Sequence, residues 1–269
     1  MAKRFPVWSF LFLLIASLIS IFPFYWMIVS ATNTSKDITL GKLTFGNHLF
    51  ENVRNVFSTS TIGLSFSNSI YLALLITFAS LLLSGIAGYA FVVFPNRKRD
   101  FLFTILIASM MVPFAVKIIP MFRLFSQLQL INNYWAIILP AIGTPFVIFF
   151  FRQNSMTFPM ETIHAARVDG LGELGIFFRI YTPIMRPTYA AAGIFVFMAS
   201  WNNYLWPLII LQSAEKYTMP LAVANLAAEF NTDYGMVMIG IVLSTIPALL
   251  VFFLLQKAFV QGIVGSVKG

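Results

Sequence analysis

Residues 7–30, VWSFLFLLIASLISIFPFYWMIVS, form a long apolar run at the start of the chain. No charged residue occurs between Phe5 and Ser35, and about 20 apolar residues are enough for a helix to cross the hydrocarbon core of a bilayer. The run therefore predicts a first transmembrane helix. A cleaved signal peptide is the alternative, since Lys3 and Arg4 precede the run, but its length and the missing small-x-small cleavage site favour an uncleaved span.

The composition of the whole chain agrees with this prediction. Of the 269 residues, 59% are hydrophobic and 10% are charged, and the mean hydropathy is +0.86, far outside the usage of soluble domains. In lipid every backbone N–H and C=O must be hydrogen-bonded within the protein, which restricts spanning structures to helices and closed barrels. The apolar runs are continuous rather than alternating. We therefore expect an all-α membrane protein.

Five further apolar runs follow the first, separated by polar segments. Residues 31–61 are rich in Asn, Thr and Ser and are predicted to form an exposed loop. The third run contains Pro113, Lys117 and Pro120, so we expect that helix to kink or to leave the bilayer early. About six transmembrane helices are predicted, at 7–30, 66–94, 101 onward, 134–151, 188–211 and 234–259.

The basic residues predict the orientation of these spans, because Lys and Arg concentrate in cytoplasmic loops. Eleven lie on the side of the two termini and six on the other side. The eleven are Lys3, Arg4, Arg97, Lys98, Arg99, Arg152, Arg167, Arg179, Arg186, Lys257 and Lys268, and the six are Lys36, Lys42, Arg54, Lys117, Arg123 and Lys216. Both termini and the 152–187 loop are therefore predicted to be cytoplasmic.

Metal and nucleic-acid binding are not indicated. The formal net charge is +8, but the basic residues are spread over short loops rather than gathered in one patch, so no nucleic-acid partner is expected. The chain contains no cysteine, and its two histidines, His48 and His164, lie far apart without ligand-like spacing. We expect no metal site.

The segment 159–170, PMETIHAARVDG, has the features of a short helix in the 152–187 loop. Pro159 suits the first turn, Glu161 opposes the positive end of the helix dipole, and Gly170 suits a left-handed stop. About three turns are too few to be stable alone in water, so this helix is expected to need a docking surface. From these residues alone, an ordinary surface helix of a cytosolic loop remains the alternative.

This loop resembles the signature of ABC-importer permeases, P-x-E-x-x-E-A-A-x-x-D-G followed by a phenylalanine, an isoleucine and P-x-x-x-P. The run WNNYLWP at 201–207 is similar to the W-N-x-Y-L-W-P run of carbohydrate-type permeases, and Gln261-Gly262 and Val267-Lys268-Gly269 match the family's ending. The resemblance covers about 66–269 and is greatest for the second permease of maltose-type transporters. The matching loop residues are Pro159, Glu161, Ala165, Ala166, Asp169, Gly170, Phe178, Ile180, Pro183 and Pro187.

The resemblance implies a type I ABC importer permease fold in the cell inner membrane, with one permease domain over 1–269. It implies that the loop forms a coupling helix between the fourth and fifth spans, which contacts an ATPase subunit through Glu161, His164, Ala165, Ala166, Asp169 and Gly170. His164 stands where the motif has its second glutamate. A bulky residue at Ala166 is expected to uncouple transport while the chain stays folded.

The implied partners are a homologous second permease, two ABC ATPase subunits and an extracytoplasmic solute-binding protein. No G-x-x-x-x-G-K-[ST] sequence occurs in the chain, so ATP and Mg²⁺ are expected to bind the ATPase subunits rather than this chain. The implied function is import of sugars or oligosaccharides, with no catalytic residue in this chain. An anionic or polyol substrate, such as a uronate oligosaccharide or glycerol phosphate, is the alternative.

The WNNYLWP run is the candidate substrate pathway. Aromatic rings stack on the apolar faces of sugars, and amides exchange hydrogen bonds with hydroxyls. An interfacial aromatic belt is the alternative. Lys117 is predicted to snorkel toward the outer surface or to contact an anionic substrate. The pathway candidates in the run are Trp201, Asn202, Asn203, Tyr204 and Trp206.

Two other classes of membrane protein are less well supported. A secondary transporter would normally place an ionisable residue at mid-membrane, but no Asp or Glu falls inside the six predicted spans. An intramembrane enzyme would need a catalytic motif such as H-E-x-x-H or G-x-S-x-G, and the sequence contains neither. A purely structural membrane protein would not explain the signature loop.

Overall fold

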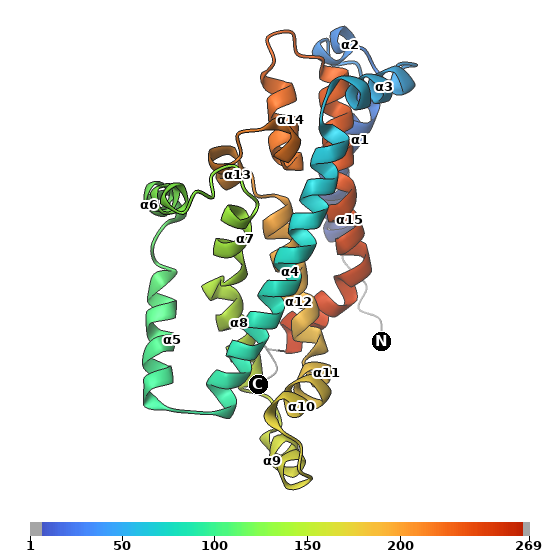
Figure 1. Ribbon diagram of the computed structural model, residues 1–269. Helices are drawn as coiled ribbons and strands as arrows, with labels where there is room; N and C mark the ends of the chain where they lie inside the picture. The colour runs from blue at the N-terminus through green and yellow to red at the C-terminus, as the bar shows by residue number, and fades with distance from the viewer. Residues whose placement is uncertain (1–6, 266–269) are drawn as a thin grey trace. The chain divides into compact units, whose positions relative to one another are not determined.

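The computed structural model describes the backbone of residues 7–265 and the side chains as far as residue 254, and every regular element in that part is helical. The all-α prediction is confirmed. The helices, labelled in Figure 1, are α1 (Val7–Ser30), α2 (Ser35–Thr39), α3 (Leu49–Thr59), α4 (Ile62–Val93), α5 (Arg97–Ser109), α6 (Phe114–Gln127), α7 (Trp135–Ile142), α8 (Pro145–Ser155), α9 (Met160–Val168), α10 (Glu173–Ile176), the π-helical turn η1 (Phe177–Tyr181), α11 (Thr182–Ile184), α12 (Arg186–Trp201), α13 (Leu205–Ile210), the 3₁₀ turn η2 (Ala214–Lys216), α14 (Met219–Ala228) and α15 (Tyr234–Gly265).

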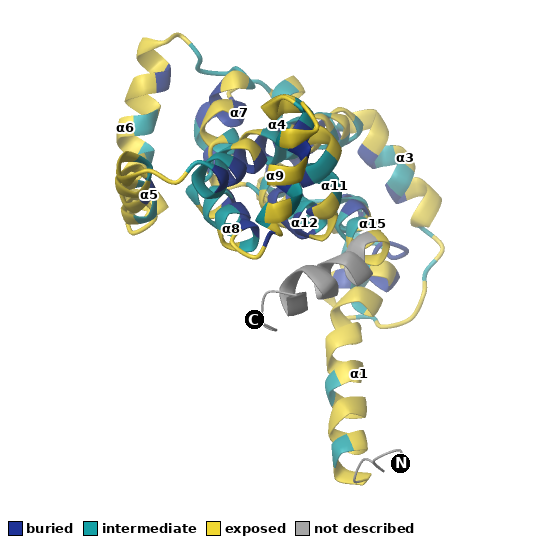
Figure 2. Ribbon diagram, turned by 90° about the horizontal axis from the view of Figure 1, so that it is seen from below, coloured by how far each residue is buried: buried dark blue, intermediate teal, exposed yellow. Residues whose placement is uncertain are grey.

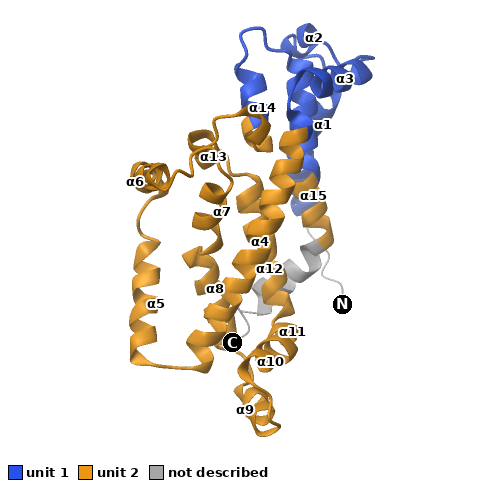
Figure 3. Cartoon of the chain, viewed as in Figure 1, with its two compact units in different colours: residues 1–63, 222–246 blue, residues 64–221, 247–269 orange. Residues whose placement is uncertain are grey.

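The chain divides into two compact units (Figure 3). The first contains residues 1–63 and 222–246, and the second contains residues 64–221 and 247–269. This division concerns internal packing alone, and the prediction of a single permease domain over 1–269 stays a prediction.

Several helices in the described part of the chain are long and apolar enough to cross a membrane. Four qualify by themselves: α1, α4, the stretch Trp135–Ser155 that comprises α7 and α8, and the stretch Tyr234–Leu254 of α15. The pair α5 and α6 qualifies as a fifth if the two are counted together, but they meet at 103°. The predicted kink in the third span is confirmed. Pro113 explains it, because proline lacks an N–H and its ring clashes with the carbonyl four residues earlier, at Ser109, where α5 ends.

The fifth predicted span, 188–211, is divided in two. Helix α12 has 16 residues, which is about 24 Å of helix and less than the ~30 Å hydrocarbon core. The chain leaves helical geometry after Trp201, and α13 begins at Leu205. Pro207 accounts for the break, since it cannot donate a hydrogen bond to the carbonyl of Asn203 and its ring crowds that carbonyl.

A break of the same kind lies inside the stretch Trp135–Ser155. Pro145 starts α8 and cannot donate to the carbonyl of Ala141, four residues earlier. The Thr144 hydroxyl donates to that carbonyl at 2.8 Å. A side chain thus satisfies the backbone group that proline leaves free, as a helix in lipid requires.

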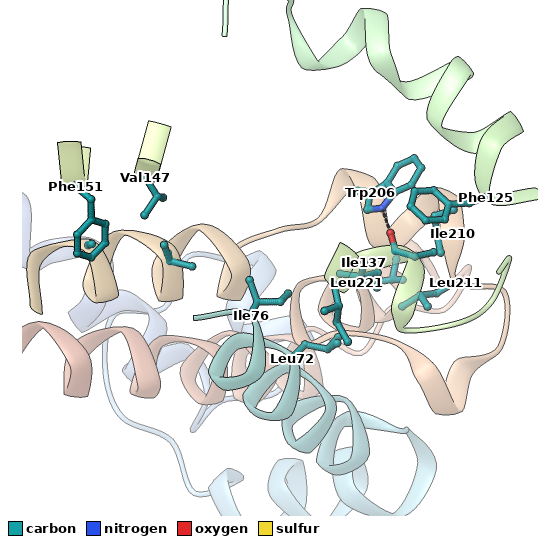
Figure 4. Close-up of a cluster of buried hydrophobic side chains, with 14 residues drawn as sticks. Leu72, Ile76, Phe125, Ile137, Val147, Phe151, Trp206, Ile210, Leu211 and Leu221 are labelled. Atoms are coloured by element: carbon teal, nitrogen blue, oxygen red, sulfur yellow. Dashed lines mark hydrogen bonds between the residues drawn. The ribbon is translucent and has the colours of Figure 1, made fainter. Parts of the chain in front are cut away.

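The core of the second unit is built on α4 (Figure 4). Leu72 and Ile76 of α4 pack with buried side chains of α6, α7, α8, α12 and α13, and the Trp206 indole N–H donates to the carbonyl of Ala136 at 2.8 Å. Glycines allow close approach further along α4. A Cβ on Gly88 would lie 2.6 Å from the Cβ of Phe151, and one on Gly85 would overlap the Tyr189 hydroxyl.

The first unit corrects the prediction of an exposed loop over 31–61, because this segment forms α2 and α3. Thr34 caps α2 by accepting from the Asp37 N–H at 3.2 Å. Asn52 of α3 is buried and donates to the carbonyls of Ala31 and Asn33, each at 3.0 Å. The polar residues that suggested a loop therefore form helix caps and buried hydrogen bonds.

Candidate functional site

Helix α9 is the predicted short helix, and it lies at one end of the second unit (Figure 1). Its end has the expected geometry. Gly170 adopts a φ of 84°, in the left-handed region that favours glycine, and its N–H donates to the carbonyl of Arg167 at 3.1 Å. The Leu171 N–H donates to the carbonyl of Ala166 at 3.0 Å. The helix therefore stops at a defined place.

One face of α9 packs against the chain's own body. Ile163 and Ala166 are buried in a cluster that includes Tyr89 of α4, Phe158 and Tyr181. This cluster provides the docking surface that so short a helix needs. Ala166 is only 5% exposed, so a bulky residue there meets the chain's own core. The expectation that such a variant uncouples transport while the chain stays folded remains a prediction.

The other face of α9 is exposed (Figure 2). We call the set Glu161, His164, Ala165 and Val168, together with Leu174 of α10, the outer face. Val168 is 88% exposed and Leu174 is 75% exposed. Asp169 and Gly170 are exposed at the end of the helix. Of the six predicted coupling residues, only Ala166 lies on the buried side.

Val168 and Leu174 were not among the predicted coupling residues. The helical spacing from His164 to Val168 indicates a shared face, and this signal was present in the sequence. Leu174 belongs to the next short helix, and no periodicity links it to α9. Only the turn at Gly170 brings the two side chains to one end of the unit.

A polar bridge connects the loop to α4, and the sequence reasoning missed it. The Arg167 Nε donates to Glu173 Oε1 at 2.8 Å, and the Tyr89 hydroxyl donates to Glu173 Oε2 at 2.7 Å. The Arg167 guanidinium also lies 5.4 Å from the centre of the Phe94 ring. We call these three residues the Arg167–Glu173–Tyr89 bridge. The hydrogen bond from Arg167 holds the pKa of Glu173 below its usual value, which keeps the carboxylate ionised near neutral pH.

The junction after α10 is also held from α8. The hydroxyls of Ser155 and Tyr181 are 2.5 Å apart, and the ring of Tyr181 stacks on that of Phe177, with the ring centres 5.5 Å apart. The π-helical turn η1 carries both rings. Helix α9 is thus connected to the membrane spans by packed aromatic rings and a polar bridge, and not by a flexible linker.

The predicted pathway residues are dispersed. Trp201 is 1% exposed and stacks on Phe197, and Trp206 is 3% exposed in the α4 core. Both indoles are therefore core residues rather than surface rings. Asn202 is exposed, and its side-chain amide donates to the carbonyl of Met198 at 3.0 Å. Tyr204 is 40% exposed.

One residue of the predicted set, Asn203, lines a cavity in the second unit. The cavity has a volume of about 220 Å³. Thr144, Ser200 and Asn203 provide its polar groups, and its apolar walls include Ile76, Val147 and Phe195. Thr144 and Asn203 stand at the two helix breaks described above. A mostly apolar pocket with a few convergent polar groups is the usual form of a small-molecule site.

Lys117 is exposed on α6, after the 103° bend. It does not line this cavity. In the part of the chain that the structure describes, no group of three or more His, Cys, Asp or Glu residues could hold a metal ion. The prediction that the chain has no metal site stays a prediction.

Comparison with known proteins identifies the family. The sequence profile described as "Binding-protein-dependent transport system inner membrane component" matches residues 80–265, which include α9, the bridge residues and the polar cavity residues Thr144, Ser200 and Asn203. The chain belongs to this family. It is therefore a multi-pass membrane protein and a component of a transport system.

Curated relatives of the family cover almost the whole chain. The chain is 50% identical over 254 residues to the lactose transport system permease protein LacG of Rhizobium radiobacter, with 94% of this chain and 93% of that protein covered. It is 36% identical to the arabinooligosaccharides transport system permease protein AraQ of Halalkalibacterium halodurans, with 93% and 92% covered. It is 32% identical to the sn-glycerol-3-phosphate transport system permease protein UgpE of Pectobacterium atrosepticum, with 97% of each covered.

A solved structure has the same fold. A chain in the crystal structure of a bacterial ABC transporter involved in the import of the acidic polysaccharide alginate matches with a TM-score of 0.85, covering 94% of this chain and 95% of that one. The sequence identity is 22%, so this likeness concerns the fold alone. The predicted ABC importer permease fold is confirmed.

Proposed function

We propose that this chain is the permease subunit of an ATP-driven, binding-protein-dependent importer of sugars or oligosaccharides. The observation that carries the proposal is the 50% identity, over 94% of the chain, with a lactose transport permease. The 36% identity with an arabinooligosaccharide permease supports the same substrate class. Lactose is accordingly the first substrate to test.

The outer face of α9 is the proposed contact with the ATPase subunits. It combines two exposed apolar side chains, Val168 and Leu174, with the carboxylate of Glu161 and the imidazole of His164. Exposed apolar patches rimmed by polar groups are typical of interaction sites. The opposite face of α9 is packed on the body, so a push on the outer face moves the helix as a unit. Because the chain has no phosphate-binding loop, ATP and Mg²⁺ belong to the partner subunits in this proposal.

The proposed assembly contains this permease, a second homologous permease, two ABC ATPase subunits and an extracytoplasmic binding protein. The bilayer orientation follows from the excess of Lys and Arg on one side, with α9 and both termini in the cytoplasm. The termini themselves lie outside the described residues, so the orientation is best tested at α9.

A second candidate substrate class is anionic. The 32% identity with a glycerol-3-phosphate permease favours it, and the exposed cation of Lys117 would suit a phosphate group. The 50% identity with the lactose permease is higher than this value and favours a sugar.

Uptake by proteoliposomes that contain the whole complex and its binding protein distinguishes the two substrate classes. Lactose uptake that requires ATP and persists in a Lys117→Gln variant supports the sugar importer. Uptake of glycerol 3-phosphate, lost in that variant, supports the alternative, and uptake driven by an ion gradient without ATP contradicts both.

A further inference from the structure

We propose that the cavity beside Asn203 is a sugar subsite within this chain, which holds one pyranose ring during passage. The proposal rests on the proposed sugar import and adds to it a place of contact. The aromatic residues first expected to stack on sugar, Trp201 and Trp206, are buried in the core. A sugar contact in this chain therefore needs another set of side chains, and the cavity provides one.

The two proline breaks explain why polar groups gather at the cavity. A regular membrane helix satisfies its own backbone and presents few polar atoms to a cavity. Here Pro145 and Pro207 interrupt two spans, and one residue within each break, Thr144 and Asn203, lines the same cavity. Discontinuous helices of this kind form the substrate sites of several classes of membrane transporter.

The hydrogen-bonding groups suit hydroxyls. The Thr144 hydroxyl donates to the carbonyl of Ala141 and keeps its acceptor lone pairs. In the described part of the chain, no hydrogen bond occupies the hydroxyl of Ser200 or the side-chain amide of Asn203, although the Asn203 backbone N–H donates to the Ser200 carbonyl at 3.2 Å. A sugar hydroxyl both donates and accepts, so these three side chains complement two or three hydroxyls on one edge of a ring.

The apolar walls and the size point to a single sugar ring. Phe195 lines the cavity, is 44% exposed and packs against Phe146 with the ring centres 4.5 Å apart, so the exposed part of its ring is the surface proposed to contact the C–H face of a pyranose. Val147 and Ile76 also line the cavity with apolar side chains. The volume of about 220 Å³ is below the ~300–1,000 Å³ of pockets for drug-sized ligands. This is room for one ring, so the rest of an oligosaccharide would extend out of the cavity.

The matched pair Asn203→Ala and Asn202→Ala tests the subsite. The two asparagines are neighbours in one turn, but only Asn203 lines the cavity, while the amide of Asn202 is bound to its own helix. In proteoliposomes with the complete complex and binding protein, we expect Asn203→Ala to raise the KM for lactose uptake about 3- to 10-fold, the range of one lost hydrogen bond. Asn202→Ala should leave it within 2-fold. Equal KM values for the two variants overturn the subsite.

A second variant, Ser200→Phe, fills the cavity. We expect the two permeases of the Ser200→Phe complex to copurify as in the wild type and the complex to lose lactose uptake. If Ser200→Phe instead prevents the two permeases from copurifying, the cavity receives a partner side chain and the subsite is overturned. Wild-type proteoliposomes that show no ATP-dependent sugar uptake would refute the proposed function itself, which keeps the two failures apart.

Discussion

Ala165 and Ala166 are adjacent but face opposite ways. Ala165 is exposed, whereas Ala166 is buried among the side chains that hold α9 to α4. The signature that this loop resembles contains the two alanines side by side, and it does not distinguish the alanine that packs in the core from the one that faces a partner. The helical spacing of Ile163 and Ala166 points to one apolar face, but the body that would cover it is distant in sequence.

We predict that Ala166→Leu destabilises the chain by about 1–3 kcal/mol, the usual cost of overpacking a core. The matched variant Ala165→Leu should unfold at the same temperature as the wild type and lower the ATPase activity that the binding protein stimulates. Thermal unfolding in detergent and the stimulated ATPase assay measure the two effects. A normal unfolding temperature for Ala166→Leu would show that α9 is not packed as described.

Gly88 gives a second test at the residue scale. An added methyl group would lie 2.6 Å from the Cβ of Phe151, and α4 would have to move away from α8. We predict that Gly88→Ala lowers stability by about 1–3 kcal/mol. Gly193 is the control, because its added Cβ would meet Leu81 at an ordinary 3.5 Å, so Gly193→Ala should change stability by less than ~1 kcal/mol. Equal unfolding temperatures for the two variants would rule out the close contact.

At the scale of elements, the Arg167–Glu173–Tyr89 bridge is the part that sequence reasoning had no means to find. Tyr89 and Glu173 are 84 positions apart, and neither belongs to a periodic pattern that points to the other. The apolar runs, in contrast, predicted α1 and α4 closely, since membrane spans depend on local hydropathy. Helices α2 and α3 were missed because their polar residues are also those of loops, and only tertiary packing decides between the two.

We predict that Glu173→Gln loosens α9 without unfolding the spans. The amide loses the charge-assisted bond from Arg167 and keeps a similar shape. Hydrogen exchange of the α9 amides should accelerate, while exchange in α4 stays unchanged. Glu161→Gln, an exposed change on the same helix, is the control and should leave α9 protected. Unchanged α9 exchange in Glu173→Gln would show that the bridge does not hold the helix.

The same bridge predicts a pH dependence. The pKa of Glu173 is lowered in the folded chain, so the bridge contributes its full stabilisation above the ordinary value of 4.5 and loses it as the pH falls through the lowered pKa. Protection of α9, corrected for the intrinsic exchange rate, should therefore be constant near neutral pH and fall only below about pH 4.5. The Glu173→Gln variant should show no such fall.

At the scale of the whole molecule, the family, the helical class and the transport role were predicted from the sequence, because they depend on hydropathy and on one signature loop. The cavity could not be predicted from the sequence. The spans 134–151 and 188–211 were predicted without breaks, and the approach of Thr144 to Ser200 and Asn203 results from packing in the second unit. Trp201 and Trp206 show the reverse case, in which an aromatic motif suggests a surface role and the structure buries both rings.

The proposed function requires that α9 faces the cytoplasm with its outer face against an ATPase subunit. The chain contains no cysteine, so Val168→Cys carries a unique thiol at the most exposed apolar position of the helix. In inside-out vesicles, a membrane-impermeant maleimide should label Val168→Cys when the ATPase subunits are absent and fail to label it in the assembled complex. Labelling from the external side of the membrane, or equal labelling with and without the ATPase subunits, would contradict the account.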